Sequence, residues 1–120
     1  MEKCPCQGSF LERFIQPAVL LLLSEEKLHG FSIHKKLMTL EFMDYSGVDP
    51  TGLYRTLKRM EASGLLRSQW DMTGTANPRR LYDITEEGIH CLHNWQETLQ
   101  LYGNSIIRLS QAIGKHFANR

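Results

Sequence analysis

The chain has 120 residues, of which 42% are apolar and 22% are charged, and it therefore suits one domain of ordinary size with a core of its own. Its longest apolar run, Ala18 to Leu23, is far shorter than the roughly 20 residues that a membrane-spanning helix needs, and no secretory signal pattern precedes it, so we expect a cytoplasmic protein with no membrane partner. The net charge of +1 hides an uneven distribution, because residues 51–80 hold six Lys and Arg residues against two acidic ones.

Residues 1–9 are expected to form a tail that contains Cys4 and Cys6. Together with Cys91 they make three cysteines, an odd number that forms no complete disulfide framework. This count favours a reducing compartment. Two thiols one residue apart can share a soft metal, although this is not the usual spacing of a zinc finger.

The first helix is expected to start near residue 10, because Ser9 and Glu12 form a capping box. Pro17 then either kinks this helix or starts a second helical piece that ends near residue 24. The sequence favours a break near Gln16.

A second helix is predicted after a turn at residues 28–30. Its apolar stripe consists of Ile33, Leu37 and Leu40 at helical spacing. The helix either ends near Leu40 or extends the stripe to Met43.

The third helix has both of its ends indicated by the sequence. Asp49 is a favoured N-cap, Pro50 stands at the first helical position, and Gly64 supplies a left-handed stop after the last turn. Its core stripe consists of Leu53, Leu57 and Met60.

Three basic residues, Arg55, Lys58 and Arg59, lie away from that stripe. They can face a phosphate backbone while the other side of the helix is buried. This pattern is typical of a recognition helix that enters the major groove of DNA.

A hairpin follows, with strands predicted over residues 65–72 and 80–84 and a turn-forming Thr-Gly-Thr-Ala-Asn-Pro stretch between them. Thr85 then caps a long helix that should run nearly to Phe117. Glu86 and Glu87 favour this start because they lie at the positive end of the helix dipole. A basic helix, a hairpin and a further helix in this order predict a winged helix-turn-helix.

The long helix carries a heptad seam, in which apolar residues recur at alternating steps of three and four. Such a seam requires another helix, so we expect a homodimer. The expected interface residues are Leu92, Trp95, Leu99, Tyr102, Ile106, Leu109 and Ile113.

Several short motifs occur in a fixed order along the chain. They are Leu28-His29-Gly30-Phe31, Leu53-Tyr54, Leu57-Lys58-Arg59-Met60-Glu61, Gly64-Leu65, Trp70, Arg79-Arg80-Leu81-Tyr82, Ile84-Thr85 and Gly88. Together they resemble the PadR family of bacterial transcriptional regulators. Parts of this order also occur in other winged-helix regulators, and the Leu-Tyr and Arg-Met-Glu elements decide for this family. The chain departs from the family pattern in having Pro50-Thr51-Gly52 where relatives show Pro-Gly followed by Ser or Thr, and Phe31 where tyrosine is usual.

The resemblance implies a mainly α fold with a small β-hairpin (α+β), in which residues 10–84 form the winged-helix domain and residues 85–120 the dimerisation helix. It further implies a homodimeric repressor of a two-fold symmetric double-stranded DNA site, released by a small-molecule, redox or metal signal. No cofactor is required. The expected DNA-binding residues are Thr51, Gly52, Tyr54, Arg55, Lys58 and Arg59 in the helix and Thr75, Asn77, Arg79 and Arg80 in the hairpin.

Two further sites are open at this stage. Trp95 and Tyr102 are bulky for a tight coiled coil, and they either complete the dimer core or border an effector pore. Cys4, Cys6, Cys91, His90 and His93 form the group that has metal or redox chemistry, although solvated histidines beside the seam are commoner.

An enzyme is the first alternative, and the sequence argues against it because no nucleophile with an adjacent base and no phosphate-binding glycine loop is present. The second alternative is a winged-helix or coiled-coil module that binds only protein. The positive charge of residues 51–80 argues against that one.

Overall fold

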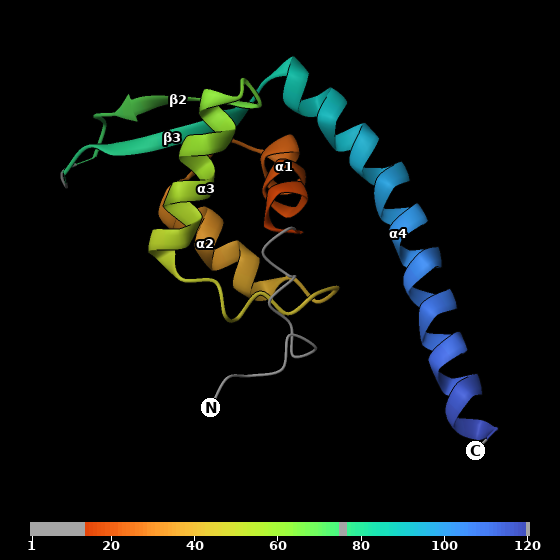
Figure 1. Cartoon of the computed structure of the whole chain (residues 1–120). Helices are drawn as coiled ribbons and strands as arrows, with labels where there is room; N and C mark the ends of the chain where they lie inside the picture. Colours follow the sequence, from red (N-terminus) through yellow and green to blue (C-terminus); the bar gives the residue numbers. More distant parts are fainter. Residues whose placement is uncertain (1–13, 75–76, 120) are drawn as a thin grey trace.

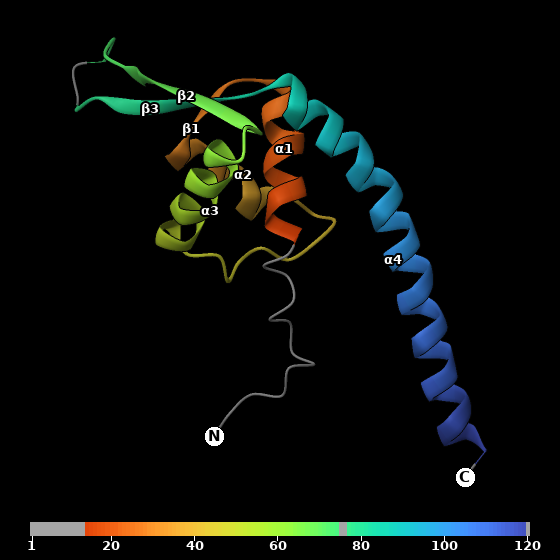
Figure 2. The same ribbon diagram turned by 45° about the horizontal axis from the view of Figure 1, so that its top comes forward.

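The computed structural model describes residues 14–74 and 77–119, which contain four helices and three strands (Figure 1). They are α1 (Ile15–Glu25), β1 (Leu28–His29), α2 (Gly30–Thr39), α3 (Pro50–Ala62), β2 (Leu66–Asp71), β3 (Arg79–Ile84) and α4 (Glu86–Ala118). Helices α1, α2 and α3 lie together, the β2–β3 hairpin extends to one side, and α4 leaves on the other (Figure 2). The predicted winged-helix architecture and its α+β class are confirmed.

The core forms where the first three helices meet, and each contributes the apolar stripe expected of an amphipathic helix. Leu57 and Met60 of α3 are fully buried, as are Ile33 and Leu37 of α2. Burying such a side chain contributes roughly 1.5 to 3 kcal/mol each. This packing fixes the face that α3 presents to solvent.

Both predicted ends of α3 are present. The Asp49 carboxylate accepts a 2.6 Å hydrogen bond from the backbone N–H of Gly52, and Pro50 begins the helix. Gly64 has a φ of 83°, which glycine adopts without steric cost. The helix is therefore closed at both ends by its own sequence.

Helix α1 runs without interruption from Ile15 to Glu25, so it begins one residue before Gln16 and agrees with the prediction of a helical piece that starts near Pro17 and ends near residue 24; a break that separates it from an earlier helix stays a prediction. Pro17 stands third in this helix. The first-turn N–H groups of a helix have no acceptor within it, so the missing N–H of proline removes no hydrogen bond there. The helix predicted to start near residue 10 falls outside the described residues over positions 10–13.

Helix α2 is shorter than the extended prediction, since it ends at Thr39, just before Leu40. Leu40 and Met43 still pack against the core, but they do so from the connecting segment. Of the three residues predicted as a turn before α2, Leu28 and His29 form instead the two-residue strand β1, and Gly30 begins α2. Its partner strand lies more than 50 residues further along the chain, so local periodicity could not indicate it.

The sheet has the order β1-β3-β2, and both pairings are antiparallel. Strand β3 is central, with Leu66 opposite Ile84 and Asp71 opposite Arg79 on the β2 side. We call the β2–β3 hairpin the wing. Each strand lies within one residue of its predicted bounds.

Helix α4 has 33 residues, which corresponds to about 50 Å of length. It accounts for most of the 65 Å long axis of the molecule. Its predicted start after Thr85 is confirmed, and it ends one residue beyond Phe117. Within residues 14–74 and 77–119, no helix is both long and apolar enough to span a membrane.

Candidate nucleic-acid interface

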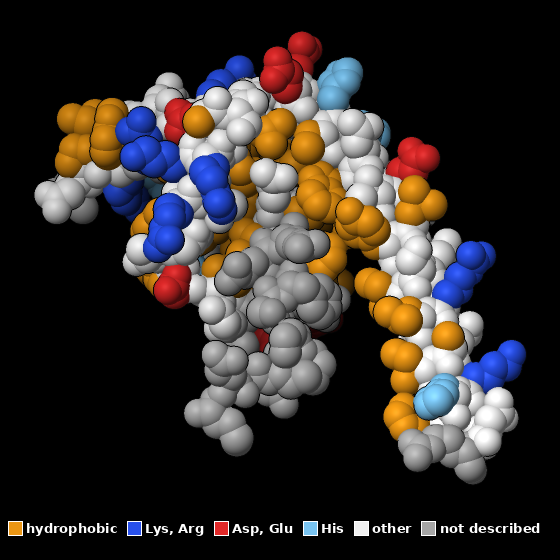
Figure 3. Space-filling view, in the orientation of Figure 1, with side chains coloured by type: hydrophobic (Ala, Val, Ile, Leu, Met, Phe, Trp, Pro, Cys, Tyr) orange, Lys and Arg blue, Asp and Glu red, His pale blue; other side chains and the backbone are white. Residues whose placement is uncertain are grey.

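The outer face of α3 is cationic. Arg55, Lys58 and Arg59 are all exposed, as is Thr51 in the first turn. Lys and Arg side chains gather over α3 and the wing on the face shown in Figure 3. Gly52 is half-buried, and its N–H is bound to the Asp49 cap. The structure thus places the predicted helix residues on one accessible face, with the backbone of Gly52 committed to the start of the helix.

Tyr54 lies where α3 meets the start of α2. Its side chain is 44% exposed. A methyl group added to Gly30 would lie 2.5 Å from Cε1 of the Tyr54 ring, so the glycine lets the two helices approach closely. Tyr54 therefore packs on one side of its ring and is open on the other.

A groove of about 660 Å³ separates α3 from the start of α2 and the edge of β3. Its lining combines cationic and aromatic side chains. The residues are His29, Phe31, Tyr54, Lys58, Glu61, Arg79, Arg80 and Tyr82, with the backbone of Gly30.

The wing places Arg80 close to α3. The Nε atom of Arg80 donates a 2.9 Å hydrogen bond to the Ser68 hydroxyl, and the guanidinium carbon lies 4.7 Å from the centre of the Trp70 ring. Arg79 and Asn77 are exposed where the hairpin returns. Thr75, also predicted to bind DNA, lies outside the described residues.

The loop end of the wing is joined to β1 through Asp71, the last residue of β2. The Asp71 carboxylate accepts hydrogen bonds from the Thr73 hydroxyl at 2.6 Å and from the Thr73 N–H at 3.0 Å. The Nε2 atom of His29 lies 2.8 Å from the same carboxylate. These contacts, those of Thr73 first, hold the pKa of Asp71 well below its ordinary value.

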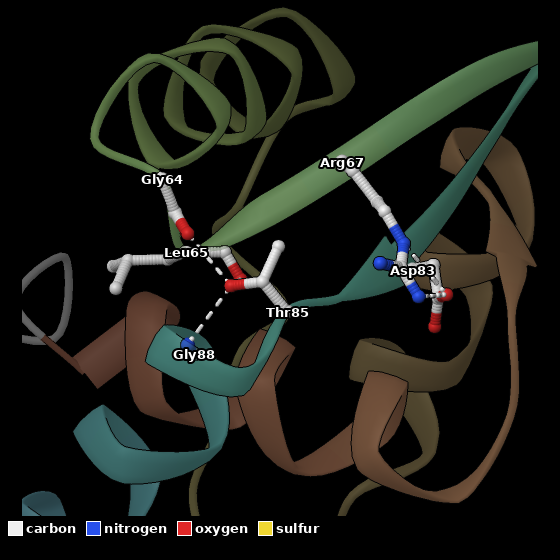
Figure 4. Close-up of polar contacts among 6 residues, drawn as sticks. All are labelled: Gly64, Leu65, Arg67, Asp83, Thr85 and Gly88. Carbon is white, nitrogen blue, oxygen red and sulfur yellow. Dashed lines mark hydrogen bonds and ion pairs between the residues drawn. The ribbon is translucent and has the colours of Figure 1, made fainter.

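Among the Lys and Arg side chains of residues 51–80, Arg67 is the one that forms an ion pair with a carboxylate in the described part of the chain. Its Nε and Nη2 atoms donate hydrogen bonds of 3.1 and 2.8 Å to Asp83 across the β2–β3 pair (Figure 4). The net positive charge counted for residues 51–80 is therefore larger than the charge that can bind phosphate. The count did not include this ion pair, because Asp83 lies outside residues 51–80.

The junction of the wing with α4 is held by Thr85. Its hydroxyl accepts from the N–H of Gly88 at 3.0 Å and lies 2.6 and 3.0 Å from the carbonyl oxygens of Gly64 and Leu65, so one donated proton serves both carbonyls (Figure 4). The turn after α3 and the start of α4 are thus joined directly.

The heptad seam of α4 divides into two parts. Leu92 and Trp95 are partly buried and pack against the core of their own chain. Beyond Leu99, the seam residues Tyr102, Ile106, Leu109 and Ile113 are 50 to 63% exposed. Apolar side chains follow the inner side of α4, while Lys and Arg lie on its outer side (Figure 3).

A second, apolar groove of about 530 Å³ lies between α1 and the first half of α4. Trp95 and Leu99 line it from α4, and Leu21 and Phe42 line it from the opposite side. Tyr102 is not part of this lining. The effector pore predicted at Trp95 and Tyr102 would lie between the α4 helices of two subunits, and it stays a prediction.

The predicted metal or redox group is not assembled within the described part of the chain, where no three His, Cys, Asp or Glu side chains lie close enough to hold a metal. His90 and His93 are exposed, whereas Cys91 packs against the core. Cys4 and Cys6 fall in the undescribed residues 1–13.

Sequence reasoning missed the side chains that organise the wing, namely His29, Glu61, Ser68, Trp70 and Asp71. Trp70 lies opposite Arg80 in the observed strand register, which the predicted strand bounds did not determine. No sequence signal joins His29 to Asp71, which are 42 residues apart.

Comparison with known proteins places these features in a family. Residues 19–94 match the model of the transcriptional regulator PadR-like family. The chain belongs to this family. The match includes all of α2, α3 and the wing.

Solved structures agree with the family assignment. A PadR-like transcriptional regulator from Bacillus cereus is 21% identical, with a TM-score of 0.72 over 87% of this chain and 98% of that one. A transcriptional regulator from Clostridium thermocellum is 25% identical, with a TM-score of 0.73 over 84% and 97%. Bacillus subtilis PadR in complex with operator DNA is 25% identical, with a TM-score of 0.62 over 70% and 47%. A comparison with curated protein sequences finds no match.

Proposed function

We propose that the protein is a homodimeric, DNA-binding transcriptional repressor. Two subunits joined by α4 would place two α3 helices in successive major grooves of a two-fold symmetric site, with the wings binding the flanking DNA, and would block polymerase. The observation that carries this proposal is the exposed cationic face formed by Arg55, Lys58 and Arg59 beside Arg79 and Arg80. The Bacillus subtilis relative, whose structure contains operator DNA, supports it.

The test of DNA binding is the double variant Arg55→Ala/Lys58→Ala. The slope of log K against log salt is negative, and each lost phosphate contact reduces its magnitude by about 0.9. We therefore expect the double variant to have a slope shallower by about two and a lower affinity at low salt. The control is Arg108→Ala/Lys115→Ala, which removes the same charge from the side of α4 opposite the seam. If the two double variants bound DNA with equal affinity, the result would instead favour a winged-helix or coiled-coil module that binds only protein.

Dimerisation is proposed for the second half of the α4 seam. Its residues are exposed and pack on no described part of the domain, and a heptad seam is stabilised by a facing helix. Ile106→Asp should give a monomer with a folded domain in analytical ultracentrifugation. Leu92→Asp should destabilise the domain itself, because Leu92 packs against its core. A dimeric Ile106→Asp variant would contradict the assignment.

Regulation by a flat aromatic ligand is proposed for the groove between α1 and α4. Its lining is mostly apolar, its volume of about 530 Å³ suits a small molecule, and it includes Trp95. Planar cationic and phenolic compounds should quench the fluorescence of Trp95 in a Trp70→Phe background. Quenching that is equal in a Trp95→Phe variant carrying Trp70 would exclude this groove.

A further inference from the structure

The Arg80 side chain is held by contacts on two sides. Trp70 stands directly opposite Arg80 in the β2–β3 register, and its ring centre lies 4.7 Å from the guanidinium carbon. This distance is within the range of a cation–π contact. The Nε atom of Arg80 donates to the Ser68 hydroxyl at 2.9 Å. Among the described residues, neither Nη atom of Arg80 has a hydrogen-bond partner, so both remain available for an acceptor.

Ser68 connects this arginine to the recognition helix. Its hydroxyl lies 2.9 and 2.8 Å from the two carboxylate oxygens of Glu61, which belongs to the last turn of α3. A hydroxyl has one proton to donate and lone pairs with which to accept. The proton is therefore directed to Glu61 while the oxygen accepts from Arg80. A continuous hydrogen-bonded chain runs from α3 through β2 to β3.

The buried Tyr82 lines the same groove as Glu61 and Arg80. Burial raises the pKa of the Tyr82 hydroxyl most strongly, the Glu61 carboxylate raises it further, and the Arg80 guanidinium opposes both. Glu61 from α3 and Arg80 from the wing thus both act on this hydroxyl, and all three side chains line the same groove as Lys58.

We propose that Glu61, Ser68 and Trp70 are positioning residues, which hold the Arg80 guanidinium in place beside α3 so that wing and recognition helix bind one half-site as a rigid unit. This inference rests on the proposed DNA-binding function. An arginine side chain loses rotamer freedom when it is immobilised on a ligand. If Arg80 has already lost this rotamer freedom in the free protein, DNA binding does not carry the entropic cost of immobilising it.

The test compares dissociation constants for a fluorescein-labelled duplex that the wild-type protein selects from a random-sequence library. Ser68→Ala and Trp70→Leu should each weaken binding about two- to ten-fold, the range expected for one immobilised side chain. Ser68→Thr keeps the hydroxyl and Trp70→Phe keeps an aromatic face, so both should bind nearly as the wild type does. Arg80→Ala should lower the salt slope by about one, whereas Ser68→Ala should leave it unchanged.

A double-mutant cycle separates positioning from a general structural effect. If Ser68 acts through Arg80, Ser68→Ala should have no further effect on affinity in the Arg80→Ala background. An equal loss in both backgrounds, or no rescue by threonine, would overturn the proposal. Should Ser68→Ala unfold, Trp70→Leu provides a second cycle with Arg80→Ala, because Trp70 contacts the Arg80 guanidinium directly.

Failure of this inference can be distinguished from failure of the proposed function. If Arg55→Ala/Lys58→Ala weakens binding but Arg80→Ala and Ser68→Ala do not, DNA binding stands and the positioning role is refuted. If the wild-type protein selects no duplex at all, the proposed function fails with it.

Discussion

Among the glycines of α3 and α4 that the structure describes, Gly88 is the one at which an added methyl group would come closest to other atoms. It lies in the first turn of α4 and is buried. A Cβ at this position would overlap the carbonyl oxygen of Leu65 and lie 2.6 Å from Cγ1 of Ile84. The Leu65 oxygen is backbone and already accepts from the N–H of Thr85 at 3.1 Å. It cannot move without breaking the contact between the turn after α3 and the start of α4.

The size of the effect follows from two opposed contributions. Forcing an extra carbon into a packed site costs about 1 to 3 kcal/mol, and overlap with backbone favours the upper end of this range. Alanine gains up to about 1 kcal/mol over glycine in a helix. We therefore expect Gly88→Ala to lower the free energy of unfolding by about 2 kcal/mol.

The assay is urea denaturation followed by circular dichroism at one fixed protein concentration, because dimerisation would make the stability depend on concentration. Gly103→Ala is the matched control, since a Cβ there meets nothing within 4 Å in the same helix. The control should leave stability unchanged or raise it by up to about 1 kcal/mol. Equal stability of Gly88→Ala and the wild type would refute the argument that this junction is packed too tightly for alanine.

Three further outcomes are expected. Because the pKa of Asp71 is lowered in the folded protein, its carboxylate contributes stability that is present above about pH 4 and is lost as the pH falls below it. Asp71→Asn should therefore make the free energy of unfolding depend less on pH between about pH 5 and 2, as measured by denaturation. A double-mutant cycle on Arg67 and Asp83 should give less than about 1 kcal/mol of coupling, because the arginine side chain is 70% exposed. Gly30→Ala should displace the Tyr54 ring and weaken DNA binding measured by anisotropy, with little loss of thermal stability, because the clash is with the outer part of a side chain that can rotate.

The sequence predicted the elements whose determinants are local. The cap at Asp49, the proline after it and the positive φ of Gly64 each act within a few residues, and α3 has the expected bounds. The same holds for the Thr85 cap of α4. The exposed cationic face of α3 also followed directly, since helical periodicity assigns the faces once the core stripe is known.

What the sequence did not predict depends on contacts between distant residues. Strand β1 exists because Leu28 and His29 pair with Tyr82 and Leu81, and two residues carry no periodicity of their own. The neutralisation of Arg67 required the strand register. The sequence pattern treats the seam of α4 as one surface, but Leu92 packs on its own domain, because the first half of α4 contacts α1.

The two halves of the seam offer a physical route for regulation. The first half of α4 is held on the domain across the groove that borders α1, and the second half extends beyond it. If the second half joins the partner subunit, the direction in which α4 leaves the domain sets the separation of the two recognition helices. Successive major grooves on one face of DNA are about 34 Å apart, so a small change of this direction would move one helix out of register. A ligand in the groove would release DNA only to the extent that it binds more tightly to the conformation in which the two helices do not match the DNA than to the conformation in which they do.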